Sequence, residues 1–297
     1  MRIGDILRNK RTVSFEFFPP KDEAGAEDLF RTIHALEPLS PDYVSVTYGA
    51  GGGTRRRTVE LVKRIKQETG IEAMAHLTCV GATRDEIAGV LDQFQEVGLE
   101  NVLPLRGDPP RGATCFEPVA DGFCYASELV GFIRSRYDFC LGGACYPEKH
   151  PEASTAEVDL DNLKRKVDAG VEFLITQLFF DNEDFYRFRE KAAAAGIRLP
   201  ILAGIMPVRS VSQIKRFTQM CGACIPDRLL AKIEAVEDDA EAVAQIGMHH
   251  AVRQCEDLLE NGVAGLHFYT LNRSTATRAI FQEIRALLEP AIAGSRS

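Results

Sequence analysis

One carboxylate of this sequence lies inside an apolar run. Glu16 is flanked by phenylalanines in the segment from Val13 to Phe18. Burial disfavours the charged form of a carboxyl group, and a carboxyl that keeps its proton suits general acid chemistry. A structural carboxylate that is hydrogen-bonded to a neighbouring strand would produce the same pattern. Glu16 is therefore a candidate general acid.

A second carboxylate, Asp108, stands where a predicted strand has ended. It follows Arg106 and Gly107 and precedes Pro109 and Pro110. An acidic side chain at a strand end can stabilise positive charge in a bound substrate, although aspartate is also common in turns bounded by proline. Asp108 is thus a candidate charge stabiliser.

Four polar residues recur at the spacing of one helix face: Asp159, Asn162, Arg165 and Lys166. Residues three and four apart are neighbours on a helix surface. A solvated face with salt bridges explains this stripe without any ligand, and on the stripe alone that interpretation is the simpler one.

The glycine-rich segment 49–54 resembles a phosphate-binding loop. It ends in Thr54, so the Gly-x-Gly-x-x-Gly fingerprint of a dinucleotide fold fails, and no Gly-Lys-Ser/Thr motif is present. The segment therefore argues against both a Rossmann fold and a P-loop.

The eight cysteines predict neither disulfides nor a metal site. We find no signal-peptide pattern at the N-terminus, so we expect the thiols to stay reduced. The one close pair, Cys221 and Cys224, lacks the second pair or the spaced histidines of a zinc site. A redox role for this pair stays open but has no supporting context.

Short β-rich runs alternate with helical patterns along the chain, which predicts parallel strands joined by helices. We predict eight strands: Val13–Phe18, Tyr43–Tyr48, Ala73–Thr78, Val102–Leu105, Phe139–Tyr146, Phe173–Phe179, Ile201–Ile205 and Gly265–Tyr269. The clearest helical patterns are Thr58–Thr69, Arg84–Val97, Ala156–Ala169, Asn182–Ala195 and Ala240–Leu259. Eight such units close into a single (β/α)₈ TIM barrel, a fold of class α/β that accounts for all 297 residues as one domain.

Alternation within the strands assigns one face to the helices and the other to the barrel interior. The inward set is unusually polar: Ser14, Glu16, Ser45, Thr47, His76, Thr78, Gln177, His267 and Tyr269. These residues gather toward the C-terminal ends of the strands, where barrel enzymes bind their substrates. We therefore expect a ligand site with a polar floor.

The composition argues against several classes of protein. The chain has 35 basic and 43 acidic residues, for a net charge of −8, and 45% of its residues are apolar. An acidic surplus argues against nucleic-acid binding. No apolar run approaches the roughly 20 residues that span a membrane. We expect a cytoplasmic globular enzyme that binds neither nucleic acid nor a membrane.

Nine ordered motifs resemble one family. They are FEFFPPK (15–21), SVTYGAGG (45–52), AHLTC (75–79), LRGD (105–108), YPEKHPEA (146–153), LKRKVDAG (163–170), TQLFFD (176–181), GIMP (204–207) and HFYTLNR (267–273). Together they are similar to methylenetetrahydrofolate reductases of the short bacterial type. One departure is the stretch from Arg111 to Phe123, which contains Cys115 and is longer than that pattern.

The resemblance implies a role for each matching residue. Glu16 would protonate the folate and open its ring to an iminium, Asp108 would lie beside flavin and pterin, and Gln177 would bind the pterin and assist hydride transfer. Contacts to folate or nicotinamide are implied for Gln213, Phe217, Tyr269 and Arg273. Contacts to FAD are implied for Thr47, His76, Arg106, Gly107, Asp108, Tyr125, Ala126, Tyr146, His150, Asp159, Asn162, Arg165 and Lys166. Arg165 and Lys166 would meet the pyrophosphate, which gives the helical stripe a function.

The resemblance also implies the reaction and the assembly. FAD would pass a hydride from NADH, with NADPH an open alternative, to 5,10-methylenetetrahydrofolate in a ping-pong cycle through the reduced flavin. The product, 5-methyltetrahydrofolate, would supply methyl groups for methionine biosynthesis. Relatives form homotetramers or dimers, so a homo-oligomer is expected. The sequence ends at Ser297, and we expect no C-terminal regulatory domain.

Two other interpretations remain at this stage. A flavin-free methyltransferase barrel that binds a pterin would share the fold and the ligand class. A non-catalytic paralogue would act as a binding subunit, although the joint presence of Glu16, Asp108 and Gln177 argues against it. Both alternatives predict a colourless protein, whereas a flavoprotein is yellow.

Overall fold

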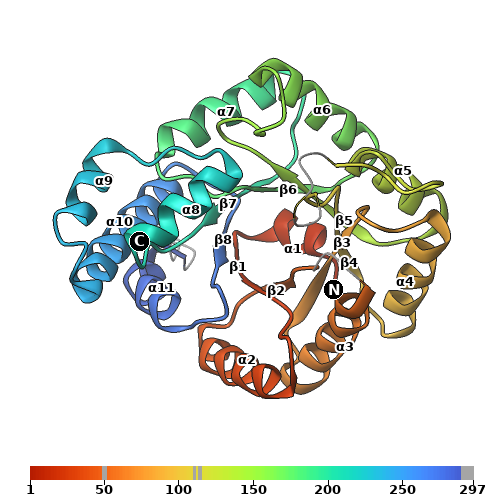
Figure 1. Ribbon diagram of the computed structural model, residues 1–297, viewed down its shortest axis with the longest axis horizontal. Coiled ribbons are helices and arrows are strands. Elements are labelled where there is room, and N and C mark those ends of the chain that lie inside the picture. The colour runs from red at the N-terminus through yellow and green to blue at the C-terminus, as the bar shows by residue number, and fades with distance from the viewer. Residues whose placement is uncertain (49–51, 110–111, 113–115, 289–297) are drawn as a thin grey trace, which may run out of the picture.

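Eight parallel strands form a closed barrel in which chain neighbours pair and β8 lies beside β1 (Figure 1). The computed structural model describes residues 1–48, 52–109, 112 and 116–288. The strands are β1 (Thr12–Phe17), β2 (Tyr43–Val46), β3 (Glu72–Thr78), β4 (Asn101–Leu105), β5 (Cys140–Cys145), β6 (Phe173–Thr176), β7 (Ile201–Ile205) and β8 (Gly265–Tyr269). The predicted (β/α)₈ barrel is confirmed.

Helices follow the strands and surround the barrel (Figure 1). They are α1 (Ile3–Asn9), α2 (Glu23–Leu36), α3 (Gly52–Thr69), α4 (Arg84–Glu96), α5 (Ala126–Arg136), α6 (Ala156–Asp168), α7 (Asn182–Ala194), α8 (Val211–Cys221), α9 (Asp227–Glu234), α10 (Ala240–Glu260) and α11 (Thr275–Leu288), with a 3₁₀ turn at Glu37–Leu39. The five predicted helices are all present, and α3 begins at Gly52 rather than Thr58. Parts of two sequence features, the glycine-rich segment (49–51) and the long stretch after Asp108 (110, 111 and 113–115), lie outside the described residues.

Two predicted strands are too long: Tyr43–Tyr48 ends at Val46, and the other is β6. The run Phe173–Phe179 pairs only as far as Thr176. The apolar pattern continues because Leu178 and Phe180 pack in a separate cluster beside α8, whereas Phe179 packs in the main core. Apolar spacing alone therefore carried the prediction past the end of the strand.

The outward faces of the strands pack on the helices, as their alternation predicts. Phe15, Phe17 and Leu77 are fully buried in one cluster with Ile33 of α2 and Phe94 of α4. Burial of each such side chain contributes about 1.5–3 kcal/mol. This layer fixes which strand residues point inward.

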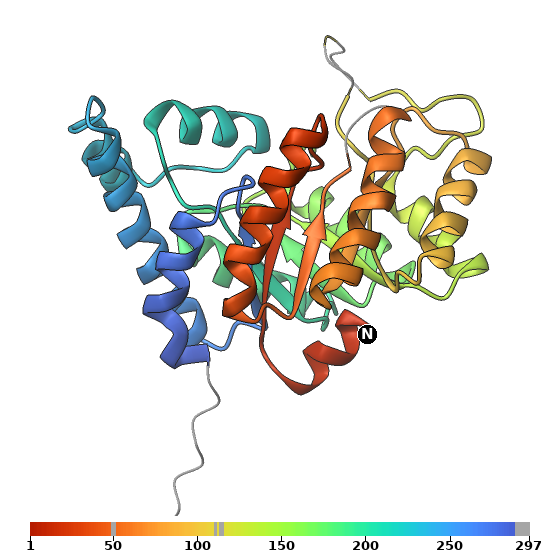
Figure 2. The ribbon, with the colours of Figure 1, turned by 90° about the horizontal axis from the view of Figure 1, so that it is seen from below.

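The N-terminal half of the barrel interior is apolar. Tyr43, Met74, Leu103 and Phe173 fill it, and Ile3 of α1 is fully buried in the same cluster. Figure 2 shows α1 below the strands, at the end opposite α8. The predicted polar interior thus occupies only the part nearer the C-terminal ends of the strands.

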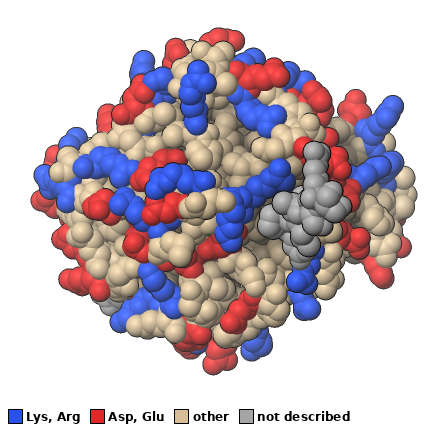
Figure 3. Space-filling model, turned by 180° about the vertical axis from the view of Figure 1, so that it is seen from behind, with Lys and Arg blue, Asp and Glu red and all other residues tan. Residues whose placement is uncertain are grey.

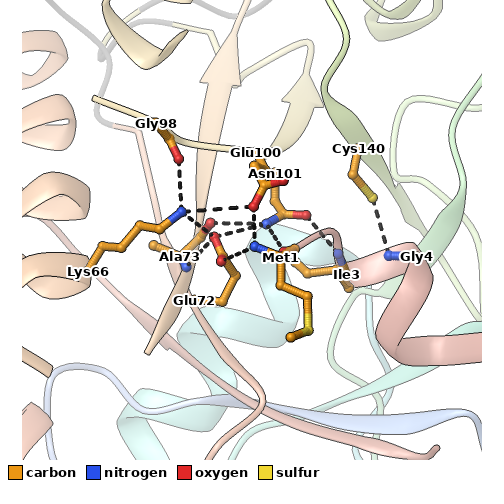
Figure 4. A network of polar contacts seen from close by, with 10 residues as sticks. All are labelled: Met1, Ile3, Gly4, Lys66, Glu72, Ala73, Gly98, Glu100, Asn101 and Cys140. Atoms are coloured by element: carbon orange, nitrogen blue, oxygen red, sulfur yellow. Dashed lines mark hydrogen bonds and ion pairs between the residues drawn. The ribbon is translucent and has the colours of Figure 1, made fainter. Parts of the chain in front are cut away.

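Hydrogen bonds hold α1 against the end of the barrel (Figure 4). The backbone N–H of Ile3 donates to Asn101 Oδ1 at 2.8 Å, and Asn101 Nδ2 donates to the carbonyl oxygen of Met1 at 3.0 Å. The N–H of Gly4 donates to Cys140 Sγ at 3.3 Å. Because this end is filled, a ligand reaches the polar interior from the other end.

Charged groups of both signs mingle on the face turned away in Figure 1 (Figure 3). Within the described ranges no helix is long and apolar enough to cross a membrane. The same ranges hold no group of three or more His, Cys, Asp or Glu residues placed to bind a metal ion.

Candidate active site

Glu16 lies at the centre of a buried polar cluster. Its side chain points into the barrel from β1, and the residue is 7% exposed. Glu16 Oε2 lies 3.3 Å from His267 Nε2 on β8 and 3.5 Å from His76 Nε2 on β3. Among the described residues no lysine or arginine forms an ion pair with it, so its closest ionisable partners are two imidazoles.

Each imidazole is held by a serine hydroxyl. Ser14 Oγ lies 2.8 Å from His267 Nδ1, and Ser45 Oγ lies 2.6 Å from His76 Nε2. Strand register explains the first contact, because Ser14 is aligned with His267. Ser45 is aligned with Met74, and His76 is the next residue on the same face of β3. The polar interior predicted from alternation is present around Glu16, where hydrogen bonds join Ser14 and Glu16 to His267 and Ser45 to His76.

His76 is neutral at neutral pH. The pKa of His76 is lowered from 6.5 to about 4, chiefly by burial; the charge of Glu16 acts in the opposite sense, and the nearby His267 contributes to the lowering. A neutral imidazole either accepts the Ser45 hydroxyl proton at Nε2 or donates from it. His76 is therefore a hydrogen-bonding neighbour of Glu16 that carries no positive charge at neutral pH.

Tyr269, at the end of β8, crosses the interior toward β6. Its hydroxyl donates to the carbonyl oxygen of Thr176 at 2.6 Å. Gly204 on β7 makes this possible, because a Cβ there would lie 2.4 Å from that oxygen and 2.7 Å from Tyr269 Cε2. Burial, followed by the charge of Glu16, raises the pKa of Tyr269 well above its ordinary value.

Tyr146 lies near the two other predicted catalytic residues, Asp108 and Gln177. Burial raises the pKa of Tyr146, and the carboxylate of Asp108 adds to this effect, while a hydrogen bond with Gln177 opposes it. The Tyr146 ring also meets His150 edge-on, with centroids 4.7 Å apart. Asp108 itself is exposed, and Gln177 is half-buried.

Arg106, at the end of β4, is already paired. Its guanidinium donates two hydrogen bonds to Glu152, at 2.5 and 2.6 Å, and these bonds raise the pKa of Arg106. The guanidinium also lies 5.0 Å from the centre of the Phe116 ring. Sequence reasoning did not find Glu152 as the partner that orients Arg106.

The α6 stripe divides into two structural residues and two free ones. Asp159 Oδ2 accepts from the backbone N–H of His150 at 2.9 Å, and Lys166 Nζ donates to the carbonyl oxygen of Ala144 at 2.7 Å. Arg165 and Asn162 are exposed, and neither makes a side-chain hydrogen bond or ion pair within the described chain. Among the described residues none of these four side chains forms an ion pair, so the stripe is not a salt-bridged surface.

The ends of β3 and β4 form a cradle around Gly107. Gly107 has φ +88°, and a Cβ there would lie 2.9 Å from Val80 Cγ1 and 3.1 Å from Thr78 Cβ. Thr78 Oγ1 is buried without a hydrogen-bond partner. Nearby, Thr47 is half-buried and Tyr125 is 61% exposed, with Ala126 opening α5. An orphaned hydroxyl beside a side-chain-free strand end suits a ligand with hydrogen-bonding edges.

Three of the implied substrate contacts lie on α8 and on the loop after β8. Gln213 Oε1 is buried without a partner, and Phe217 is half-buried against the cluster beneath α8. Arg273 is exposed and lines a cavity together with Tyr269 and Arg209. Sequence reasoning missed Arg209, although a basic residue just after a strand end was a visible signal.

The closed barrel and the polar cluster at the carboxyl ends of its strands define a (β/α)₈-barrel enzyme. A family model for methylenetetrahydrofolate reductase matches residues 2–285. The chain is 44% identical over 274 residues to 5,10-methylenetetrahydrofolate reductase of Salmonella typhimurium, covering 92% of this chain and 90% of that protein. It belongs to the methylenetetrahydrofolate reductase family.

Two further comparisons add detail. Methylenetetrahydrofolate reductase (NADH) 1 of Arabidopsis thaliana is 40% identical over 309 residues, covering 99% of this chain and 52% of the plant protein. A solved structure of an uncharacterized protein from Clostridium thermocellum that binds two copies of 5-methyl-5,6,7,8-tetrahydrofolic acid has a TM-score of 0.63 at 17% identity. It covers 95% of this chain and 96% of that one, and supports the fold.

Proposed function

We propose that this protein reduces 5,10-methylenetetrahydrofolate to 5-methyltetrahydrofolate with FAD as its cofactor and NAD(P)H as the electron donor. The observation that carries the proposal is the buried Glu16 with His267 and Ser14 behind it. The substrate must accept a proton on a ring nitrogen before its methylene carbon can accept a hydride. A buried carboxyl group supplies such a proton.

Glu16 would deliver this proton, opening the five-membered ring of the folate to an iminium. His267 Nε2, 3.3 Å from the carboxyl oxygen, could then return a proton to Glu16. Ser14 bonds the opposite ring nitrogen of His267 and so fixes the orientation of the imidazole. The three residues thus hold and move one proton at Glu16 Oε2.

Asp108 and Gln177 would act on the pterin from the Tyr146 side. A carboxylate near the iminium favours its positive charge, and the amide of Gln177 can bind the polar edge of the pterin. Tyr146 stays protonated because burial raises its pKa, so its hydroxyl can act as a neutral hydrogen-bond donor. Asp108, Gln177 and Tyr146 would orient the substrate so that its ring nitrogen faces Glu16.

FAD, when bound, would carry the hydride from NAD(P)H to the folate. NAD(P)H and the folate would occupy the same pocket, one after the other. The residues that would hold FAD surround the cradle at β3 and β4: Thr47, His76, Arg106, Gly107, Asp108, Tyr125, Ala126, Tyr146 and His150. Asp159, Asn162, Arg165 and Lys166 of α6 would extend this surface. The guanidinium of Arg165 is exposed and forms no ion pair within the described residues, which suits a pyrophosphate.

The test is spectroscopic. The protein as purified, or after addition of FAD, is expected to be yellow and to bleach when NADH or NADPH is added without oxygen. Methylenetetrahydrofolate should then restore the colour. The rates of bleaching by NADH and by NADPH show which of the two is the preferred electron donor. A protein that binds folate but no flavin would favour the methyltransferase alternative, and one that binds without turnover would favour the non-catalytic paralogue.

The biological setting follows from the same proposal. We propose a cytoplasmic homo-oligomer, a dimer or tetramer, in which residues 1–297 form one FAD-binding catalytic domain. Its product would supply methyl groups for methionine biosynthesis. Light scattering of the purified protein tests the assembly, since a monomer at micromolar concentration would contradict it.

A further inference from the structure

Side chains close the C-terminal end of the seam between the first and last strands. The main-chain pairing of β1 with β8 ends where Glu16 lies opposite Tyr269. Beyond that point, Asn272 Oδ1 accepts from the backbone N–H of Phe18 at 2.8 Å, and Asn272 Nδ2 donates to the carbonyl oxygen of Phe18 at 2.9 Å. One amide thus bonds both main-chain groups of a single residue, as a neighbouring strand does in a parallel ladder.

Thr270 makes a second contact, and this one reaches the predicted acid. Thr270 Oγ1 donates to the carbonyl oxygen of Glu16 at 2.6 Å and accepts from the backbone N–H of Asn272 at 3.2 Å. Thr270 is 5% exposed, so little water competes for its hydroxyl. We call Thr270 and Asn272 the β1–β8 clasp. Together they hold the peptide groups that directly follow Glu16.

The backbone of the loop that carries the clasp is strained. Leu271 has φ +53° and Asn272 has φ +56°. Left-handed conformations are unfavourable for residues other than glycine, although asparagine adopts them more readily than leucine does. The side chain of Leu271 packs with Tyr269 in the cluster beside α8, and Thr32 of α2 donates to the carbonyl oxygen of Asn272 at 3.3 Å. Strain of this kind persists where the surroundings hold it, and it is concentrated at functional sites.

The carboxyl group of Glu16 depends on its own strand for its position. Its nearest ionisable partners, His267 and His76, lie at 3.3 and 3.5 Å, which is long for a hydrogen bond to a charged group. Phe18, two residues further on, is 39% exposed, so apolar packing holds this end of β1 only in part. A proton donor must come within hydrogen-bond reach of the atom that it protonates, and a misplacement of about 1 Å can cost about 10²-fold in rate. Small movements at the end of β1 would therefore matter.

We propose that Thr270 and Asn272 are positioning residues for Glu16. The clasp fixes the peptide groups after Glu16 against the end of β8, and so sets how far the carboxyl group reaches toward the ring nitrogen of the folate. The inference rests on the proposed function, in which Glu16 is the acid, and extends it to two residues that act through the main chain of β1. Loss of the clasp should slow proton transfer to the folate and leave reduction of the flavin in place.

Stopped-flow absorbance of the FAD-loaded protein, followed across a range of pH, separates the two half-reactions. Thr270→Val keeps the shape of the side chain and removes both hydrogen bonds of its hydroxyl. Reoxidation of the reduced flavin by saturating methylenetetrahydrofolate should then slow by about 10- to 100-fold, with a displaced pH profile. Thr270→Ser keeps the hydroxyl and should recover most of the rate. Reduction of the flavin by the preferred nucleotide should stay near the unmodified rate in both variants.

Asn272→Gly separates the clasp from the backbone strain. Glycine adopts a positive φ without steric cost, so a slower folate half-reaction in this variant reports the lost amide alone. We expect a loss of about tenfold. Ser40→Gly, at another left-handed residue (φ +51°) in the turn before β2, is the matched control and should change neither half-reaction. Asn272 is half-buried, so its variant keeps the test decisive even if Thr270→Val folds poorly.

A double variant shows whether the clasp acts through the acid. In the Glu16→Gln background, Thr270→Val should slow the folate half-reaction no further, because the proton that the clasp positions is already gone. A further loss of the same size would overturn the proposal. So would an unchanged rate and pH profile in both Thr270→Val and Asn272→Gly, or an equal loss in the two half-reactions, which would show general damage to the barrel. If the unmodified protein binds folate and never reduces it, the proposed function fails and the clasp fails with it.

Discussion

His267 contacts Ser14 through one ring nitrogen and Glu16 through the other. The two distances are 2.8 Å from Nδ1 to the serine hydroxyl and 3.3 Å from Nε2 to the carboxyl oxygen. His267 has no exposed surface, so water does not replace either contact. The contacts of Glu16 with His267 and His76 therefore lie inside the barrel, at the side away from the open end.

Glu16→Gln should separate the two halves of the proposed reaction. Glutamine keeps the shape and loses the transferable proton, so folate reduction should fall by about 10²- to 10⁴-fold. Oxidation of NADH by the flavoprotein, which needs no proton from Glu16, should persist. Stopped-flow absorbance of each half-reaction measures both. Glu37→Gln, which changes an exposed glutamate 3.2 Å from His34, is the control. Near-normal folate reduction in Glu16→Gln would remove Glu16 as the acid.

Ser14→Ala should lower folate turnover by changing its pH dependence. Loss of the hydroxyl leaves His267 Nδ1 without its partner, so the imidazole is held less firmly toward Glu16. We expect kcat for folate reduction to fall by about tenfold, with a displaced pH profile and little change in KM. The double variant with Glu16→Gln should be no slower than Glu16→Gln alone. Additive losses would show that Ser14 acts independently of the acid.

The strand pattern made much of this site predictable. Alternation along β1 and β8 assigned Glu16, Ser14 and His267 to the interior, although 251 residues separate His267 from Glu16. The contacts themselves depend on register, which aligns Ser14 with His267, and period-two alternation alone does not fix which inward residues face each other.

Other parts of the site were beyond sequence reasoning for physical reasons. The pairing of Arg106 with Glu152 joins two loops whose paths no periodicity describes. Arg209, Arg216 and Arg273 form no ion pair with a carboxylate among the described residues, and only the packed structure shows which carboxylates lie too far away. The stripe on α6 looked like a salt-bridged face, yet Lys166 is bonded to a backbone carbonyl of β5, because the helix packs against that strand.

Protein stability should depend on pH through His76. The pKa of His76 is lowered to about 4 from 6.5, chiefly by burial. Between these values the unfolded chain binds more protons than the folded one, so the free energy of unfolding falls as pH drops from about 6.5 to about 4. The full loss is roughly 3 kcal/mol, and above pH 6.5 the contribution is constant.

Urea denaturation at several pH values measures this effect. His76→Gln should flatten the fall in unfolding free energy between pH 6.5 and 4, although the substitution itself lowers stability at pH 7. His34→Gln, at a surface histidine, is the matched variant and should leave the pH dependence in place. An identical pH dependence in His76→Gln and the unmodified protein would rule out His76 as its source.

Gly204→Ala should damage both folding and the site. The added methyl would lie 2.4 Å from the Thr176 carbonyl oxygen and 2.7 Å from Tyr269 Cε2, and neither a strand backbone nor a buried ring can withdraw easily. We expect a loss of about 1–3 kcal/mol in the free energy of unfolding and weaker folate binding, since Tyr269 must move. Tyr269→Phe, which removes only the hydrogen bond to Thr176, should cost about 1 kcal/mol.

Gly131→Ala supplies the comparison for Gly204→Ala, because a Cβ at Gly131 on α5 meets nothing within 4 Å. In a helix this exchange should raise the free energy of unfolding by up to about 1 kcal/mol. Urea midpoints and folate titrations of the three variants give the result. If Gly204→Ala kept both the midpoint and the folate affinity of the unmodified protein, Tyr269 would not need the space that Gly204 leaves, and its placement across β7 would be wrong.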